Sequence, residues 1–169
     1  EYGVTSEDLA RVKVAHSNHA SNNPKALMKQ RVTVDDVVNS RWIVRPCAHL
    51  LDCCLETDNA TCIIVTSVEH AKDLKQQPVY IRAVQGRGTK PGGDFHYQHG
   101  PITRVAGHYV GPRIFELADI THDDIDVTGC YDAFTYTVVL QLEAYGFCEE
   151  GEGKDYIKSG IVNLGDKRP

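Results

Sequence analysis

The chain has 169 residues, 41% of them hydrophobic, so it can bury a core of its own without disulfide or metal staples. Its formal net charge is −5 and its 18 Lys and Arg residues are scattered, which excludes the basic stripe that nucleic-acid binding requires. No apolar run approaches the roughly 20 residues that cross a bilayer, so the sequence predicts no membrane span.

The six cysteines have neither the paired spacing of a zinc site nor a signal peptide before them. We therefore expect free thiols in a reducing cytoplasm and no bound metal. The chain begins at Glu1 instead of Met and stops at Pro169 without completing a helix. We interpret it as a piece cut from a longer protein.

Short helices and loops are predicted for residues 1–45. Thr5 stands three residues before Asp8, which is the pattern of a helix capping box, and apolar residues follow at helical spacing. Residues 17–24 (SNHASNNP) are rich in Asn and Ser and end in Pro, so they predict a loop. A capped helix is then expected over 33–40.

A strand, a helix and a second strand are predicted to follow. Residues 48–66 are nearly continuous in apolar side chains on both sides of a turn, which is typical of strands buried on both faces. A capped helix is expected from residue 66 to residue 74, and an alternating β-branched strand over 78–84. Such a succession is a crossover unit of an α/β sheet.

A glycine-rich segment, residues 86–100, is longer than most connections between elements. Its backbone N–H groups, with Arg87 and Lys90, could meet a phosphate, although neither the Walker spacing nor GxGxxG is present. His96 or His99 could supply an acid or a base. Because no partner carboxylate can be assigned, we favour a plain loop.

Two further helices are predicted in the remainder of the chain. The first covers 106–117, with a break expected at the Gly111-Pro112 pair. A strand is expected from residue 123 to its end at Tyr131, and a second helix starts near Phe134 and is closed by Gly146 at its C′ position.

The junction at Tyr131 and Asp132 is the most promising site, because ligands of open α/β folds collect at the carboxyl ends of strands. A phenol there can donate a hydrogen bond to an enolate or carbonyl oxygen, and Asp132 can cap the following helix. A reactive thiol needs an accessible, electropositive setting, so Cys53, Cys54 and Cys130 are interpreted as packed core thiols instead. The histidines outside the glycine-rich segment are interpreted as structural.

Several stretches of the sequence resemble the lipid-transfer or sterol-carrier-protein-X branch of the thiolase superfamily. They are SNHASNNP at 17–24, TVDDVVNSR at 33–41, LLDCCLETDNA at 50–60 and YDAFTYTVVLQLEAYGFCEEGEG within 124–153. The resemblance implies an α/β fold in which 46–169 begin a thiolase-like βαβαβ half, a mixed sheet with helices on both faces. Residues 1–45 would then end the preceding region. The family's nucleophilic cysteine would lie upstream of this chain and its histidine loop downstream.

The YDAF motif departs from the thiolase pattern in an informative way. Thiolases have Asn or His where this chain has Tyr131, and that residue helps to form an oxyanion hole. Tyrosine there is similar to the thiolase-like aldolases of steroid side-chain degradation, which cleave a β-hydroxyacyl-CoA. The resemblance implies a retro-aldolase in which Tyr131 gives or takes a proton and Asp132 supports it. The coenzyme A thioester would be the substrate, contacted by Arg87 and Lys90, with no separate cofactor.

Two alternatives stay open at this point. One is a thiolase that transfers an acyl group through the upstream cysteine, with Tyr131 polarising the thioester oxygen. The other is a non-catalytic lipid-binding or scaffold protein of the same family. The resemblance also implies a cytoplasmic homodimer, paired with a zinc-ribbon and OB-fold partner protein.

Overall fold

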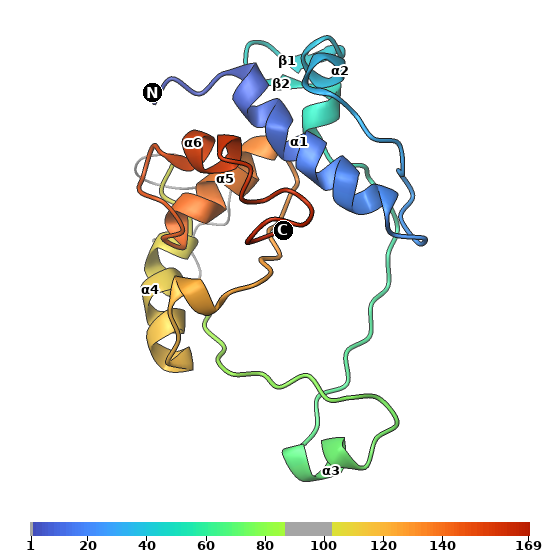
Figure 1. Cartoon of the computed structure of the whole chain (residues 1–169), viewed down its shortest axis with the longest axis vertical. Helices are drawn as coiled ribbons and strands as arrows, with labels where there is room; N and C mark the ends of the chain where they lie inside the picture. Colours follow the sequence, from blue (N-terminus) through green and yellow to red (C-terminus); the bar gives the residue numbers. More distant parts are fainter. Residues whose placement is uncertain (1, 87–102) are drawn as a thin grey trace.

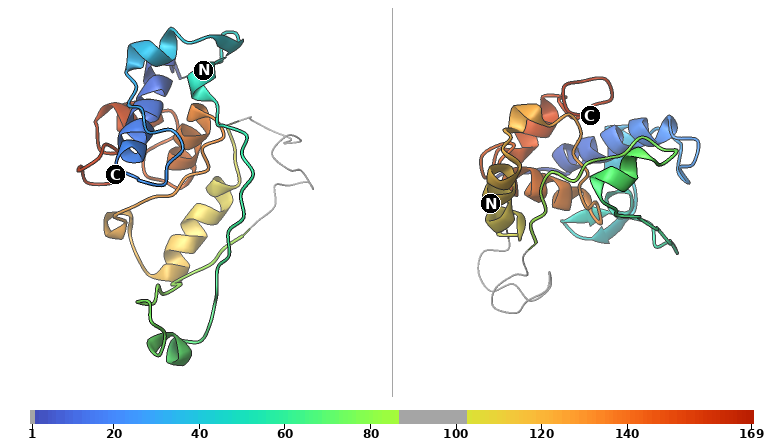
Figure 2. Two further views of the ribbon diagram at one scale, coloured as in Figure 1. Left: turned by 90° about the vertical axis from the view of Figure 1, so that its right-hand side faces the viewer. Right: turned by 90° about the horizontal axis from the view of Figure 1, so that it is seen from below.

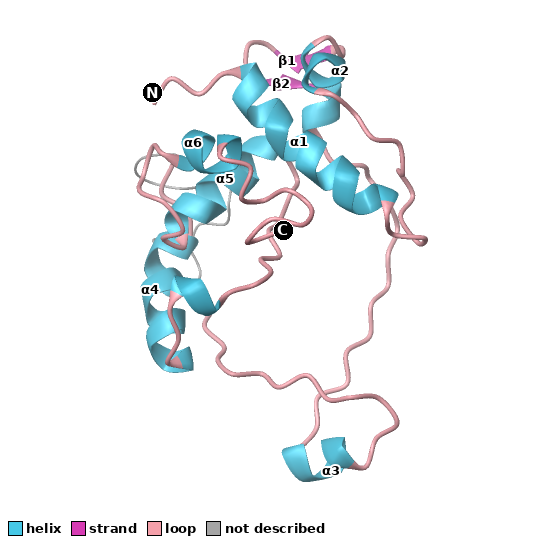
Figure 3. Ribbon diagram, viewed as in Figure 1, coloured by secondary structure: helices cyan, strands magenta, loops and turns pink. Residues whose placement is uncertain are grey.

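A computed structural model describes residues 2–86 and 103–169 of the chain (Figure 1). Helices make up most of its regular structure, as Figure 3 shows. They are α1 (Ser6–Ser21), α2 (Val34–Val38), α3 (Val68–Lys72), α4 (Gly107–Ala118), α5 (Thr135–Ala144) and α6 (Gly153–Lys158). The described residues hold one antiparallel pair of strands, β1 (Trp42–Val44) and β2 (Ala48–His49), and two 3₁₀ turns, η1 (Leu50–Asp52) and η2 (His122–Asp124). None of the helices in these two ranges combines the length and the hydropathy of a bilayer-spanning segment.

The capping box predicted at Thr5 and the capped helix predicted within 33–40 are confirmed. The Thr5 side chain caps α1 and the Thr33 side chain caps α2 in the same way, each together with an aspartate three residues later. The predicted loop at 17–24 is wrong in part, because α1 continues to Ser21. The hydroxyl groups of Ser17 and Ser21 donate to carbonyls one turn back, so these polar residues are accommodated within the helix.

Helices from the two ends of the chain share one hydrophobic core. The α1 helix packs across α5 and α6, and Figure 1 shows the blue and the red segments side by side. The buried side chains at this contact come from all three helices and are Val12, Val138, Val139, Leu142 and Ile157. The predicted boundary near residue 45 stays a prediction, since nothing in these contacts tests it.

The α4 helix packs closely on the end of α5 and is not broken at Pro112, contrary to the prediction. Pro112 lies inside the helix and removes the hydrogen bond to the carbonyl of His108 without ending the helix. Glycine explains the close approach. A Cβ atom added at Gly107 would come within 2.9 Å of the Ala144 Cβ, and one at Gly111 within 3.1 Å of the Ala144 carbonyl oxygen.

The long strands predicted over 48–66 and 78–84 are not formed. Within those ranges only Ala48 and His49 pair as a strand, and the apolar side chains beyond them face solvent, with Ile64 84% and Val79 93% exposed. Figure 2 shows these segments as long extended stretches that lead to and from α3. A strand needs the backbone groups of a neighbour, and no described segment lies beside them as one.

Of the other elements predicted after residue 66, the helices α3 and α5 are confirmed and the strand before α5 is not. The predicted helix at 66–74 is confirmed as α3, which Ser67 caps. The strand predicted at 123–131 is replaced by η2 and an extended stretch without a strand partner among the described residues. The α5 helix is confirmed, and Gly146 follows its C-cap with a φ of +79°, as a C′ glycine does.

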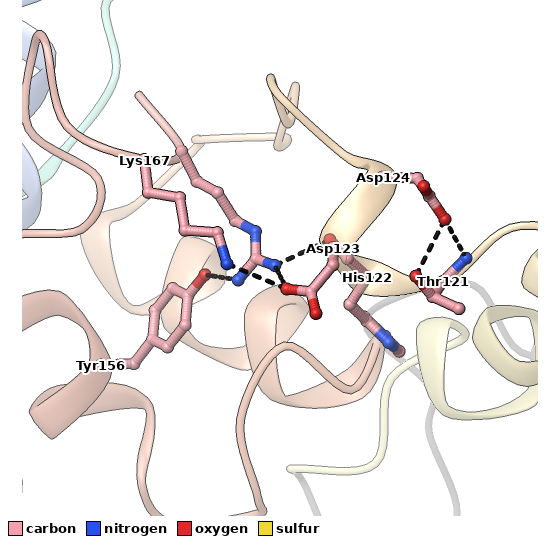
Figure 4. A network of polar contacts seen from close by, with 7 residues as sticks. Thr121, His122, Asp123, Asp124, Tyr156 and Lys167 are labelled. Atoms are coloured by element: carbon pink, nitrogen blue, oxygen red, sulfur yellow. Dashed lines mark hydrogen bonds and ion pairs between the residues drawn. The ribbon is translucent and has the colours of Figure 1, made fainter.

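The last residues of the chain are tied down by a network of charges (Figure 4). Lys167 reaches the Asp123 carboxylate at 2.9 Å, and Arg168 donates to the same oxygen and to the His122 carbonyl. A weaker contact of 3.4 Å joins Arg168 to the Tyr156 hydroxyl. The hydrogen bond from Lys167, followed by the nearby cationic charges, lowers the pKa of Asp123. This network holds the tail against η2 and α6.

Candidate active site

Tyr131 ends the extended stretch that precedes α5, and its side chain is 71% exposed. Its backbone is bound by side chains of α5. The Tyr131 N–H donates to Gln141 Oε1 at 3.0 Å, and Gln141 Nε2 donates back to the Tyr131 carbonyl at 2.7 Å. The Thr137 hydroxyl also lies 3.0 Å from this carbonyl. The structure therefore fixes the main chain of Tyr131 and leaves the phenol accessible.

The residues that follow Tyr131 in the YDAF motif are bound by η1 and the segment just after it. The Cys54 N–H donates to the Ala133 carbonyl at 3.0 Å, and Cys53 forms an isolated antiparallel bridge with Phe134. The Thr135 hydroxyl donates to Asp52 Oδ1 at 2.8 Å. Side chains of α5 thus fix the Tyr131 end of the loop that carries this motif, and residues 52–54, far away in the sequence, fix its other end.

Asp52 belongs to a buried polar cluster. Its Oδ2 accepts from the His49 backbone N–H at 2.8 Å and lies 3.3 Å from His49 Nδ1. The two side chains are only 2% and 3% exposed, and the Trp42 ring covers the imidazole with a centroid separation of 3.6 Å. Every one of these contacts is internal, in agreement with the structural role predicted for His49.

Asp132 pairs with His16 on α1, a contact that the sequence reasoning missed. The His16 Nδ1 and Asp132 Oδ2 atoms lie 3.5 Å apart, with side chains 40% and 60% exposed. Burial lowers the pKa of His16, and the Asp132 carboxylate acts in the opposite direction. The predicted cap by Asp132 is wrong, because Phe134 is the N-cap residue of α5 and Thr137 bonds back to it.

Two cavities flank the stretch 127–130 just before Tyr131. One of about 370 Å³ lies between α4 and α5 and is mainly apolar, with Arg82, Phe115, Cys130 and Gln141 among its lining residues. The other, of about 260 Å³, lies between α1, α5 and the chain end and includes His16 and Cys130. Within the described residues, no group of three or more His, Cys, Asp or Glu side chains could hold a metal ion.

Three of the six cysteines are held in a form that disfavours nucleophilic attack. All six are free, and Cys54 is exposed, so its predicted packing in the core is wrong. Its backbone bonds to Ala133, but no paired strand packs over its side chain among the described residues. Cys53 and Cys130 are half-buried, and burial raises the pKa of both thiols. Burial also raises the pKa of Cys148, to about 12. These three thiols stay protonated at neutral pH, and a protonated thiol is a poor nucleophile.

The candidate coenzyme A contacts, Arg87 and Lys90, lie outside the described residues, as do His96 and His99. They stay predictions.

Comparisons with known proteins extend this picture. A family model described as "Thiolase C-terminal domain-like" matches residues 81–169. A steroid side-chain-cleaving aldolase of Thermomonospora curvata is 42% identical over all of this chain and 44% of its own length. A 17-hydroxy-3-oxo-4-pregnene-20-carboxyl-CoA lyase of Mycobacterium tuberculosis is 41% identical over 99% of this chain and 44% of its own.

A solved structure, named "Ltp2-ChsH2(DUF35) aldolase", has the same fold. It superposes with a TM-score of 0.87 at 37% identity and covers 99% of this chain and 44% of the matched one. The chain therefore spans less than half the length of these relatives. The resemblance seen in the sequence is confirmed, and so is its similarity to steroid side-chain aldolases in particular.

Proposed function

Because this chain belongs to the thiolase C-terminal domain-like family, we propose that the complete protein cleaves a bulky, steroid-type β-hydroxyacyl-CoA by a retro-aldol reaction. The observation that carries the proposal is the placement of Tyr131. Its phenol is exposed while its backbone is bound on both sides by Gln141, so it is presented to a ligand in a defined position. The two relatives described above, a side-chain aldolase and a CoA lyase, support the same chemistry.

The reaction needs one base and one acid. A base removes the proton of the β-hydroxyl group, the bond between the α and β carbons breaks, and its electron pair moves toward the thioester carbonyl as an enolate. The enolate then takes a proton at the α carbon, which yields a ketone or aldehyde and a shortened acyl-CoA. A phenol at Tyr131 can serve either end of this transfer. Asp132, paired with His16, supports the loop from the side of α1.

The remaining parts of the proposal concern the complete protein. The extended segments within residues 53–66, 78–84 and 125–131 become strands of the βαβαβ half when the rest of the protein supplies their neighbours. Arg87 and Lys90 contact the coenzyme A portion of the substrate, and the reaction uses no separate cofactor.

The proposed assembly is a cytoplasmic homodimer bound to a zinc-ribbon and OB-fold partner. The solved relative is named as a pair, Ltp2 with ChsH2, which supports a partner protein.

The test is a product analysis with the complete protein and no added coenzyme A. We expect a β-hydroxyacyl-CoA to give a ketone and a shortened acyl-CoA in equal amounts, with no covalent acyl-enzyme detectable by mass spectrometry. Cleavage only of a β-ketoacyl-CoA, only when coenzyme A is added, and through an acyl-enzyme would instead identify a thiolase. The absence of turnover with both substrates, while acyl-CoA still binds, would identify a non-catalytic relative.

A further inference from the structure

The side chain of Gln141 replaces a strand neighbour for Tyr131. In a sheet, the N–H and C=O of one residue pair with backbone groups of the adjacent strand. No strand pairs with residues 125–131 in the described part of the chain, yet both backbone groups of Tyr131 are bound. One amide on α5 supplies the acceptor and the donor.

The orientation of this amide is determined by its surroundings. Gln141 Nε2 has two hydrogen atoms, and it donates one to the Tyr131 carbonyl at 2.7 Å and the other to the Thr137 carbonyl at 2.8 Å. Gln141 Oε1 accepts the Tyr131 N–H at 3.0 Å. A flipped amide would place its oxygen against two carbonyl oxygens and its nitrogen against an N–H group. Only one arrangement satisfies all three contacts.

Thr137 does not duplicate this role. Its hydroxyl has a single hydrogen, and it lies 2.6 Å from the Phe134 carbonyl and 3.0 Å from the Tyr131 carbonyl. The Phe134 carbonyl, at the shorter distance, is the favoured acceptor of that hydrogen. Gln141 is thus the main donor to Tyr131, and its amide is the only side-chain group among the described residues that bonds to the Tyr131 N–H.

We propose that Gln141 is a positioning residue for the reaction, which sets the place and direction of the Tyr131 phenol through the Tyr131 backbone. The inference rests on the proposed function, since it assigns Tyr131 to proton transfer. It requires no contact between Gln141 and the substrate. Loss of the amide frees the main chain of Tyr131 to shift, and a displacement of this kind lowers the rate of a positioned proton transfer more than it weakens substrate binding.

The first variant is Gln141→Met, which keeps the length of the side chain and removes its donor and acceptor. In the complete enzyme we expect kcat to fall about tenfold or more while KM changes less than about twofold. Retention of kcat within twofold would overturn the proposal. A thermal unfolding curve of the same variant separates this effect from a failure to fold.

The second variant, Gln141→Glu, gives a signature that a structural role would not produce. A neutral carboxyl group carries one donor and one acceptor, enough for both Tyr131 contacts, whereas a carboxylate carries no donor. Hydrogen bonding to the neutral form raises the pKa of such a group above the roughly 4.3 of an unperturbed glutamate. The ratio of variant to wild-type kcat should therefore be about threefold or more higher at pH 5 than at pH 8.

Gln77→Glu is the matched control, because it adds a carboxylate at an exposed position. Its kcat ratio should be the same at both pH values. An equally flat ratio for Gln141→Glu would contradict the proposal.

A measurement independent of turnover separates this inference from the proposed function. The Tyr131 amide hydrogen is bound in the structure, so its exchange with solvent should be slow in wild type and at least about tenfold faster in Gln141→Met. If the complete protein cleaves no β-hydroxyacyl-CoA but exchange accelerates, the proposed reaction is wrong while the backbone contact stands. If exchange is unchanged, Gln141 does not hold Tyr131 and the inference fails.

Discussion

Two regions of the molecule contain apolar side chains in similar proportion but differ in how far they bury them. One is packed around α1 and α5, and the other is the largely extended region from residue 53 to residue 86. In the packed region, Leu142 and Val138 are 5% and 6% exposed, because helices satisfy their own backbone and need only a facing surface. In the extended region, Ile64 and Val79 are 84% and 93% exposed. The difference teaches that apolar strands, unlike helices, cannot be buried without neighbours that supply backbone hydrogen bonds.

Tyr131 lies at the border between these two regions. Its chain segment is extended, like residues 53–86, but side chains of α5 hold its backbone and the Cys54 backbone holds the loop after it. The candidate site is therefore ordered by the packed region even though the extended segments around it lack strand partners among the described residues.

The largest difference between the two regions is expected in the free energy of unfolding, when one aspartate in each is replaced by alanine. Asp52→Ala removes a buried acceptor of contacts from His49 and Thr135, so the free energy of unfolding should fall by roughly 3–5 kcal/mol. Asp58→Ala, in the exposed region, should change it by less than about 0.5 kcal/mol. Denaturant unfolding of the complete protein measures both. Equal effects would break the comparison.

A second prediction concerns Ile64 in the complete protein. If the remaining polypeptide covers this residue as a strand, Ile64→Ala should destabilise the complete protein by about 2–4 kcal/mol. An effect below about 0.5 kcal/mol would mean that the segment stays exposed and that the proposed βαβαβ half is wrong. The same unfolding experiment decides between the two.

Helix caps give a smaller contrast. Thr33 caps α2, which packs on α1, whereas Ser67 caps α3, which has no buried residue. Thr33→Ala should lower the midpoint of global unfolding by the equivalent of about 1 kcal/mol. In the 169-residue chain without the rest of the protein, Ser67→Ala should affect only local opening of α3, seen as faster amide exchange there with an unchanged midpoint. A shift of the global midpoint by Ser67→Ala would show that α3 unfolds together with the core.

The smallest expected effect is electrostatic. Burial lowers the pKa of His16, and the Asp132 carboxylate is the influence that raises it. Asp132→Asn should therefore lower the His16 pKa further, so that protonation begins only at a more acidic pH. An NMR titration of the imidazole measures this shift, with Asp155→Asn as the control carboxylate. A His16 pKa that rises or stays constant would contradict the pairing.

Local signals in the sequence predicted the helices well. Thr5, Thr33 and Ser67 act through contacts within one turn, and Gly146 acts through its own backbone freedom, so a short window of sequence contains the whole cause. Pro112 misled the prediction, because a proline inside a helix removes one hydrogen bond but does not always end the helix when the rest of it is packed.

Contacts between distant residues could not be predicted in the same way. The apolar runs near Ile64 and Val79 have the composition of strands, but pairing depends on segments elsewhere. The His16 contact with Asp132 joins two parts of the chain that only the packing of α1 on α5 brings together. In the sequence, Gln141 is an ordinary polar residue of a helix, and only the folded structure brings its amide to the Tyr131 backbone.

The most direct test of the central claim is kcat for Tyr131→Phe in the complete protein, measured as ketone released from a β-hydroxyacyl-CoA. Tyr136→Phe, which removes a phenol hydroxyl from the neighbouring helix, is the matched control. We predict that Tyr131→Phe lowers kcat by about 10²–10⁴-fold and that Tyr136→Phe keeps it within about twofold. Turnover by Tyr131→Phe at the wild-type rate would contradict the assignment of Tyr131 to proton transfer.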